Sequence, residues 1–260
     1  MKKIKALLVD LDGTIYQNGK LIDNTLITIQ KLNKNNFPFR FITNNTRKSR
    51  QSICLYLRKL GLIIDESYIY TTMYAAINYC KKNNLKKIKI ISLTDEYKND
   101  VSDIDIVESK PDAIILGDLS EKFNYYKLNE IFIELQQGAK LIALHKNRYW
   151  LKNNNITLDL GPFVSLLEYA SNQQATVIGK PNKKFFEIAA HDFKMDYANI
   201  AVIGDDIESD VRGSINTGMQ GVLVKTGKYI EEQVEKSKIK PNYIIDSFSH
   251  ITKNLFNDEF

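Results

Sequence analysis

Short apolar runs alternate along the chain with longer segments in which apolar residues recur every three or four positions. The short runs are rich in Val, Ile and Leu and have the length of buried strands, whereas the longer segments have the period of amphipathic helices. Strands that alternate with helices are typical of parallel sheets, so we predict an α/β protein with a doubly wound parallel sheet. The predicted strands are 6–9, 39–42, 88–92, 113–116, 141–144, 201–203 and 222–224, and the predicted helices are 24–33, 49–60, 74–82, 125–137, 161–171, 183–193 and 208–217.

Length and composition are those of a globular protein. Of the 260 residues, 43% are hydrophobic and 26% are charged, and no apolar run approaches the roughly 20 residues needed to span a bilayer. The basic start, Met1–Val9, imitates a secretion signal, but Asp10 and Asp12 interrupt the apolar stretch too early. We therefore expect a cytoplasmic protein without membrane contact, at a length where a second, smaller domain becomes common.

Charge and cysteine content disfavour a nucleic-acid-binding protein and a protein with functional cysteine pairs. The net charge of +5 modestly favours an anionic substrate, but the basic segment Lys81–Lys87 is better explained as the end of a helix than as a nucleic-acid site. We therefore expect no nucleic-acid partner. Cys54 and Cys80 lie in helical patterns and form no Cys-x-x-Cys pair, so we expect reduced, structural thiols.

Two carboxylates follow the first predicted strand. The period of two sends Asp10 and Asp12 to the same side, and Gly13 lets the backbone turn sharply away. Such a pair suits a nucleophile that attacks phosphorus with an acid beside it, although an ordinary loop explains the tetrapeptide alone equally well. Residues at the other strand ends can distinguish these two interpretations, because ligands of open parallel sheets lie beyond the carboxyl ends of the strands.

Two more strand ends carry groups suited to a phosphate. Thr43 and Asn44 offer a hydroxyl and backbone amides after the strand 39–42, although a loop with a helix cap would look the same. Lys180 follows the apolar run 175–178 and precedes a helix that Pro181 is positioned to begin. A lysine there can neutralise a transferring phosphoryl group, whereas an isolated lysine is usually a solvated surface residue.

An acidic cluster follows the strand 201–203. Such crowding is unfavourable unless a cation or a lysine balances it, and helix capping explains only part of it. Carboxylates from two strand ends, a backbone carbonyl and phosphate oxygens would satisfy a hard cation such as Mg²⁺. The strand ends together predict one phosphoryl-transfer site. The acids of the cluster are Asp205, Asp206, Glu208 and Asp210, and the site combines Asp10, Asp12, Thr43, Asn44, Lys180 and Asp205.

The order of these motifs resembles the haloacid dehalogenase (HAD) superfamily. Its phosphatases carry Asp-x-Asp-Gly-Thr, then a Ser or Thr after the second strand, then a Lys, then an acidic motif, and all four are present here in order. The resemblance implies a Rossmann-like core in which Asp10 is the nucleophile. It also implies that Asp12 protonates the leaving group and later activates the hydrolytic water.

The same resemblance implies the binding groups. Thr43 and Asn44 would hold the phosphate, and Lys180 would steady the phosphoaspartate. Asp210 would orient metal waters or Lys180. The choice of Asp205 over Asp206 as a metal ligand rests on the resemblance alone, and whether Asp206 shares in metal binding stays open. The implied ligands of Mg²⁺ are Asp10, the carbonyl of Asp12 and Asp205.

The spacing of the motifs indicates where a second domain is inserted. The 31 residues from Asp12 to Thr43 are filled by one unit of about 30 residues, whereas the 137 from Thr43 to Lys180 leave about 100 for a separate domain. In the superfamily this placement marks the C2-type cap of subclass IIA, which includes phosphatases of N-acetylglucosamine phosphate, pyridoxal phosphate and 4-nitrophenyl phosphate. We expect a HAD-like core of residues 1–72 and 179–260 and an inserted α/β cap of residues 73–178.

Three longer stretches, 141–150, 160–170 and 222–229, resemble members of subclass IIA that act on phosphoamidates and pyrophosphate. The resemblance therefore implies a Mg²⁺-dependent phosphatase of a small phosphorylated substrate, with these classes favoured. Because the core reads only the phosphoryl group, the cap should select the substrate, and the loop Leu158–Pro162 is our candidate for that contact. His145 lies in an apolar run and is better explained as a packed histidine.

Several alternatives remain open. A phosphatase of pyridoxal phosphate, nucleotides or sugar phosphates would use the same site, as would a non-catalytic relative that binds a phosphometabolite or a protein. A dehalogenase needs no acid at Asp12, and a phosphomutase usually carries its cap between the first two motifs, so both are disfavoured. The sequence also leaves open whether the chain forms a homodimer.

Overall fold

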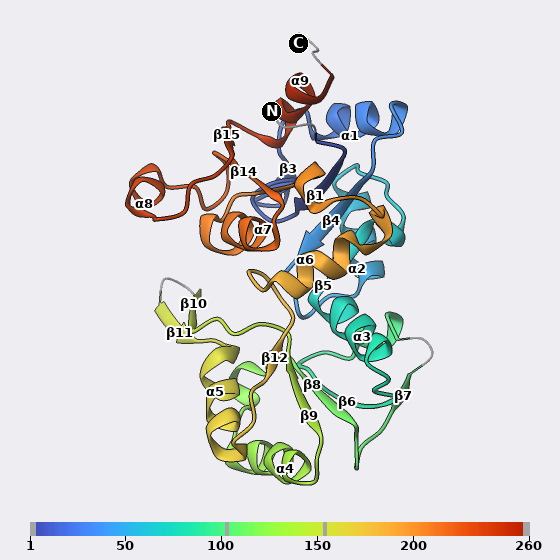
Figure 1. Cartoon of the computed structure of the whole chain (residues 1–260), viewed down its shortest axis with the longest axis vertical. Helices are drawn as coiled ribbons and strands as arrows, with labels where there is room; N and C mark the ends of the chain where they lie inside the picture. The colour runs from blue at the N-terminus through green and yellow to red at the C-terminus, as the bar shows by residue number, and fades with distance from the viewer. Residues whose placement is uncertain (1–3, 102–103, 153–154, 257–260) are drawn as a thin grey trace. The chain divides into compact units, whose positions relative to one another are not determined.

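The computed structural model describes residues 4–101, 104–152 and 155–256, and its contacts divide the chain into two compact units (Figure 1). We call them the core unit and the inserted unit, and each has its own main sheet. No helix in the described part of the chain combines the length and the apolar character needed to cross a membrane. The core unit comprises Met1–Thr43, Gln51–Tyr70 and Lys180–Phe260, and the inserted unit comprises Asn44–Arg50 and Thr71–Gly179.

A six-stranded sheet in the order β15-β14-β13-β1-β4-β5 forms the centre of the core unit. Strand β1 lies between β13 and β4 and runs parallel to both, and β13, β14 and β15 are also paired in parallel. Every residue of β1, β13 and β14 is buried, which explains their unbroken apolar runs. The strands are β1 (Ala6–Asp10), β4 (Phe39–Thr43), β5 (Ile69–Thr71), β13 (Ile200–Gly204), β14 (Gln220–Val224) and β15 (Tyr243–Ile245).

Helices cover this sheet on both faces. Ile29 and Leu32 of α1 share one hydrophobic cluster with Leu7 and Val9 of β1. Leu8 points to the opposite face and is fully buried as well, and α6 contacts both β1 and α7. The helices are α1 (Thr25–Lys34), α2 (Arg50–Lys59), α6 (Lys183–Ala190), α7 (Arg212–Thr217), α8 (Glu231–Lys236) and α9 (Ile251–Phe256).

The inserted unit contains a second parallel sheet, in the order β12-β9-β8-β6-β7. Helices α4 and α5 pack against each other, and β10 and β11 form an antiparallel hairpin (Figure 1). The elements are α3 (Thr72–Lys82), β6 (Lys87–Ile91), β7 (Asp105–Ile106), β8 (Ala113–Leu116), α4 (Tyr125–Gln136), β9 (Lys140–Ala143), β10 (Tyr149–Lys152), β11 (Asn155–Leu158), α5 (Leu160–Ser171) and β12 (Thr176–Val177).

The predicted α/β class with parallel sheets is confirmed, and each predicted strand corresponds to an observed one. Two helices differ in detail. The helix predicted at 183–193 ends at Ala190, and the helix predicted at 208–217 opens as a π-helical turn, Ile207–Val211. The hairpin of β2 (Tyr16–Gln17) and β3 (Lys20–Leu21) was not predicted, because strands of two residues carry no periodic signal.

The segment Asn44–Arg50, which the sequence assigned to the core, groups with the inserted unit. Arg50 Nε donates a hydrogen bond to Asp100 Oδ1 at 2.8 Å, and the backbone N–H of Ser49 donates to Glu96 Oε2 at 2.7 Å. These contacts bridge about 50 positions of sequence, which spacing alone does not reveal.

Candidate active site

Asp10 and Asp205 lie at the carboxyl ends of neighbouring strands. Asp10 is the last residue of β1, and Asp205 follows β13, whose Ile203 pairs with Val9. Both acids are buried, with 6% and 4% of their surface exposed. The edge of the parallel sheet therefore brings together two acids that are far apart in sequence, as predicted from the strand ends.

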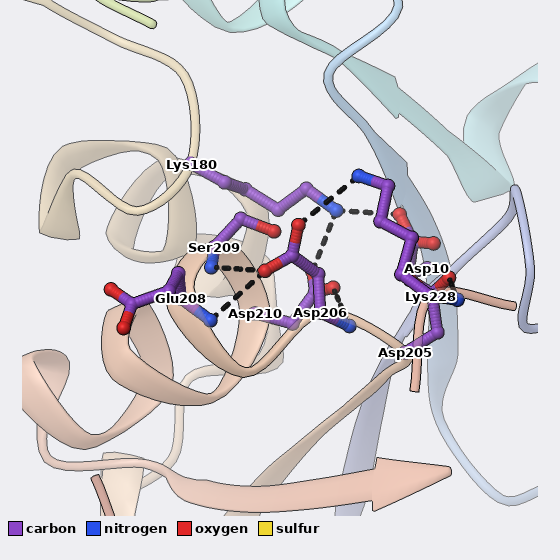
Figure 2. A network of polar contacts seen from close by, with 8 residues as sticks. All are labelled: Asp10, Lys180, Asp205, Asp206, Glu208, Ser209, Asp210 and Lys228. Carbon is purple, nitrogen blue, oxygen red and sulfur yellow. Dashed lines mark hydrogen bonds and ion pairs between the residues drawn. The ribbon is translucent and has the colours of Figure 1, made fainter. Parts of the chain in front are cut away.

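Lys180 joins Asp10 to Asp210 in a buried network that Figure 2 shows. Its Nζ donates to Asp10 Oδ1 at 2.5 Å and to Asp210 Oδ1 at 2.6 Å. The alternative of a solvated surface lysine is therefore wrong. An ammonium group held between two carboxylates can stabilise negative charge that develops beside Asp10.

The buried groups of this network perturb one another. Burial raises the pKa of Asp10 to about 6 despite the opposing charge of Lys180, and it raises the pKa of Asp205 to about 6 and that of Asp210 to about 7. Burial disfavours the charged form of Lys180 as well, but Asp10 and Asp210 outweigh it and raise the pKa of the ammonium group. Lys180 bonds to Asp10 and Asp210, and the charge of Lys228 acts on Asp205 and Asp206. Full ionisation of these four acids against two lysines leaves negative charge in excess.

That excess of buried negative charge fits a divalent cation. One carboxylate oxygen from each of Asp10, Asp205 and Asp210 lies within 4.8 Å of the others. Mg²⁺ prefers oxygen ligands of this kind and usually keeps several waters. The cluster therefore contains the two carboxylates expected to bind Mg²⁺, with Asp210 beside them.

Asp206 and Glu208, the other two acids of the cluster, lie outside the buried network. Asp206 accepts a hydrogen bond from the backbone N–H of Glu208 at 2.9 Å, and its Oδ2 lies 3.1 Å from Lys228 Nζ. Glu208 is exposed. The crowding noted in the sequence is thus resolved in two ways, since Asp205 and Asp210 join the buried network while Asp206 caps the π-helical turn.

Asp12 lies past the end of β1 and is more accessible than Asp10, since its side chain is exposed. Tyr16, from the hairpin β2–β3, forms a hydrogen bond with the Asp12 carboxylate, and burial together with that carboxylate raises the pKa of the Tyr16 hydroxyl. Asp12, Tyr16, Tyr56 and Asp205 line a cavity of about 400 Å³. The candidate acid is therefore reachable from solvent while the candidate nucleophile is buried.

Thr43 and Asn44 are consecutive but belong to different units. Thr43 ends β4 and is buried, and the preceding Ile42 pairs with Asp10, so Thr43 reaches the edge of the sheet that carries Asp10. Asn44 begins the segment that packs within the inserted unit. Its role in phosphate binding stays a prediction.

Two parts of the site were missed at the sequence level, Tyr16 and the loop Thr226–Lys228. The backbone N–H of Lys228 donates to Asp205 Oδ2 at 2.8 Å, and the Thr226 hydroxyl donates to the carbonyl of Gly13 at 2.5 Å. A signal for the loop was present, because it follows the predicted strand 222–224 just as the other groups follow theirs.

Comparisons with known proteins agree with this arrangement. Family models described as haloacid dehalogenase-like hydrolase and HAD-hydrolase-like match residues 7–106 and 177–251. Haloacid dehalogenase-like hydrolase domain-containing protein 2 of Bos taurus is 36% identical over 98% of this chain and 96% of its own. Phospholysine phosphohistidine inorganic pyrophosphate phosphatase of Homo sapiens is 30% identical over 95% of this chain and 92% of its own.

A solved structure shares the fold. The p-nitrophenyl phosphatase from Archaeoglobus fulgidus superposes with a TM-score of 0.87 at 22% identity, covering 97% of this chain and all of that one. The family models and the relatives show that the chain is an α/β enzyme of the hydrolase class. It belongs to the haloacid dehalogenase-like hydrolase family, so the resemblance inferred from its motifs is confirmed.

Proposed function

We propose that the protein is a Mg²⁺-dependent phosphatase that hydrolyses a small phosphorylated substrate through an aspartyl-phosphate on Asp10. The observation that carries this proposal is the buried contact of Lys180 with Asp10 and Asp210. Burying a charged group is unfavourable, and an ammonium group beside a carboxylate nucleophile suits the transfer of a phosphoryl group. The phosphatase among the relatives supports the same chemistry.

In the first half-reaction, a carboxylate oxygen of Asp10 attacks phosphorus, and the bond from phosphorus to the leaving group breaks. The electron pair of that bond goes to the leaving atom, which takes a proton from the carboxyl group of Asp12. Lys180 stays protonated, because the pKa of its ammonium group is raised, and it offsets the charge gathered around Asp10.

In the second half-reaction, water attacks the phosphorus of the aspartyl-phosphate. Asp12, now ionised, takes a proton from that water, and the bond between phosphorus and Asp10 breaks to release phosphate. The hydrogen bond from Tyr16 restrains the carboxylate of Asp12 during both steps. Each turnover returns Asp10 as a carboxylate and Asp12 as an acid.

A bound Mg²⁺ would add positive charge and orient the phosphate oxygens. Asp10 and Asp205 would hold it through their carboxylates and Asp12 through its carbonyl oxygen, with Asp210 adjacent. These donors fit the ion because they are oxygens, and the negative charge of the acids around them exceeds the positive charge of Lys180 and Lys228.

For the substrate, we propose phosphoamidates or pyrophosphate. The name of the human relative, phospholysine phosphohistidine inorganic pyrophosphate phosphatase, supports this class. Pyridoxal phosphate, nucleotides and sugar phosphates are the second candidates, because they present the same phosphoryl group. A non-catalytic binding role is disfavoured by the complete set of Asp10, Asp12, Lys180 and Asp205. We also propose that the two units are the predicted core and cap domains, and that the protein acts in the cytoplasm.

The test is turnover of 4-nitrophenyl phosphate, pyrophosphate and a phosphoamidate by the full chain with and without Mg²⁺. We expect Mg²⁺-dependent release of phosphate and a loss of at least about 10³-fold in kcat for Asp10→Asn, because the nucleophile is lost. Asp192→Asn is the control, since Asp192 is half-exposed and bonds to Arg40 away from the acidic cluster. A wild-type protein that hydrolyses none of these compounds, or an active Asp10→Asn variant, contradicts the proposal.

A further inference from the structure

The loop that follows β14 contacts two parts of the proposed catalytic machinery. The Thr226 hydroxyl donates to the carbonyl oxygen of Gly13, in the turn that carries Asp12. The backbone N–H of Lys228 donates to Oδ2 of Asp205, a proposed ligand of Mg²⁺. One short loop thus contacts both the turn that carries Asp12 and the acid proposed to bind the metal.

Two glycines make this close approach possible. Gly227 has a φ of +61°, and a Cβ there would lie 2.0 Å from Asp205 Oδ2 and 2.7 Å from the Cα of Gly13. Gly13 has a φ of +79°, and its Cβ would lie 2.1 Å from the same oxygen. Both positions therefore exclude side chains, by backbone conformation and by space.

Further contacts restrict the position of the loop. The backbone N–H of Gly227 donates to Gln17 Oε1 at 3.4 Å, in the hairpin β2–β3. Lys228 Nζ pairs with Asp206 Oδ2 at 3.1 Å, as Figure 2 shows. The loop is thus fixed between the hairpin that supplies Tyr16 and the acidic motif after β13.

We propose that Thr226–Lys228 is a positioning loop that orients the Asp205 carboxylate for the cation and the Gly13 turn for proton transfer by Asp12. The Lys228 amide holds Oδ2 of Asp205, and this hydrogen bond restricts the orientation of the carboxylate that would bind Mg²⁺. Such support of a metal ligand by a neighbouring hydrogen bond typically changes metal affinity by about 10- to 100-fold. This inference rests on the proposed function and deepens it, because it adds the loop after β14 to the site.

The test compares Gly227→Ala with Gly218→Ala in the full chain. Gly218 is the matched control because its φ is +83° and a Cβ there would meet nothing within 4 Å. Both variants impose a left-handed alanine, but only Gly227→Ala drives a methyl group against Asp205. Calorimetric titration with Mg²⁺, in the absence of substrate, should show at least about tenfold weaker binding for Gly227→Ala and binding within about twofold of wild type for Gly218→Ala.

A second pair isolates the hydroxyl contact. Thr226→Val removes the hydrogen bond to Gly13 and should lower kcat more for alkyl phosphates, which need the acid, than for 4-nitrophenyl phosphate. Thr226→Ser keeps the hydroxyl and should restore the wild-type ratio. Thr226→Val and Thr226→Ser introduce no steric clash, so they test the loop even if Gly227→Ala does not fold.

Two results would overturn the positioning role. The first is a Mg²⁺ affinity that is unchanged in Gly227→Ala, or that falls equally in Gly218→Ala. The second is a ratio of kcat values for alkyl phosphates and 4-nitrophenyl phosphate that is the same in Thr226→Val and Thr226→Ser. These outcomes are distinct from a failure of the proposed function, which the wild-type protein would reveal by taking up no Mg²⁺ in the same titration.

Discussion

Asp210 is the residue on which the charge balance of the buried network depends. Its side chain is 1% exposed and accepts a hydrogen bond from Lys180. It lies so close to the end of β13 that a Cβ at Gly204 would fall 2.3 Å from its Cγ. The glycine before Asp205 is therefore required by the packing of Asp210, and Asp210 in turn holds Lys180 beside Asp10.

The raised pKa values predict how stability depends on pH without metal. Burial raises the pKa of Asp10 to about 6 and that of Asp210 to about 7, from the usual 3.8, so the folded protein holds more protons than the unfolded chain between these values. The free energy of unfolding should therefore fall as the pH rises from about 4 to 7. Urea denaturation in EDTA should show a shallower fall for Asp210→Asn, which removes one of these groups.

Asp112→Asn is the control for this measurement, because the pKa of Asp112 is lowered, chiefly by hydrogen bonds from the backbone N–H groups of Lys87 and Lys86. The contribution of this carboxylate to stability is therefore complete above its pKa in the unfolded chain and is lost at lower pH. The substitution should leave the fall in the free energy of unfolding between pH 4 and 7 unchanged. A slope identical in wild type and Asp210→Asn would contradict the assigned charge state.

Residues that directly follow apolar strands were predictable from the sequence, whereas residues placed by irregular structure were not. Asp10 and Asp205 follow strands of one sheet, so the rule about strand ends is sufficient for them. Lys180 follows β12, a strand of the inserted unit's sheet, so that rule does not explain its contact with Asp10. The different contacts of Asp206 and Asp210 depend on the π-helical turn Ile207–Val211, which the helical period of the sequence does not predict.

At the scale of elements, the two residues predicted to bind phosphate, Thr43 and Asn44, fall in different units. Thr43 ends a strand of the core sheet, while the residues after it are held by long-range contacts in the inserted unit. Arg50 bonds to Asp100 and also lies over the ring of Tyr74, 3.8 Å from its centroid. Such contacts join positions far apart in sequence, so spacing could predict that a domain is inserted but could not assign the residues after Thr43.

Asp100→Asn should destabilise the protein by about 1–3 kcal/mol, because it removes the charge that pairs with Arg50 while keeping a polar side chain. Asp100 is 4% exposed, and its carboxylate also accepts a hydrogen bond from the backbone N–H of Arg50 at 3.3 Å. Asp95→Asn is the control, since the Asp95–Lys98 pair is exposed to solvent and should contribute little to stability. Equal effects in chemical denaturation would contradict a stabilising role of Asp100.

At the scale of the whole molecule, the proposed chemistry lies in the core unit, and we propose that the inserted unit selects the substrate. Within the loop Leu158–Pro162, Asp159 caps α5 through the backbone N–H of Leu160 at 2.8 Å, and a Cβ at Gly161 would lie 2.4 Å from the carbonyl oxygen of Asn147. Both residues are therefore needed for the local fold. Leu158 is 63% exposed, so it tests the predicted contact with substrate without disturbing the core of the unit.

The most direct test of the central claim is to trap the phosphorylated enzyme. Asp12→Asn lacks the base of the second half-reaction, but 4-nitrophenolate leaves without help from an acid, so the aspartyl-phosphate should accumulate. Acid quenching followed by mass spectrometry of peptides should find the phosphoryl group on Asp10. A phosphoryl group on another residue, or turnover with none on Asp10, would contradict the account.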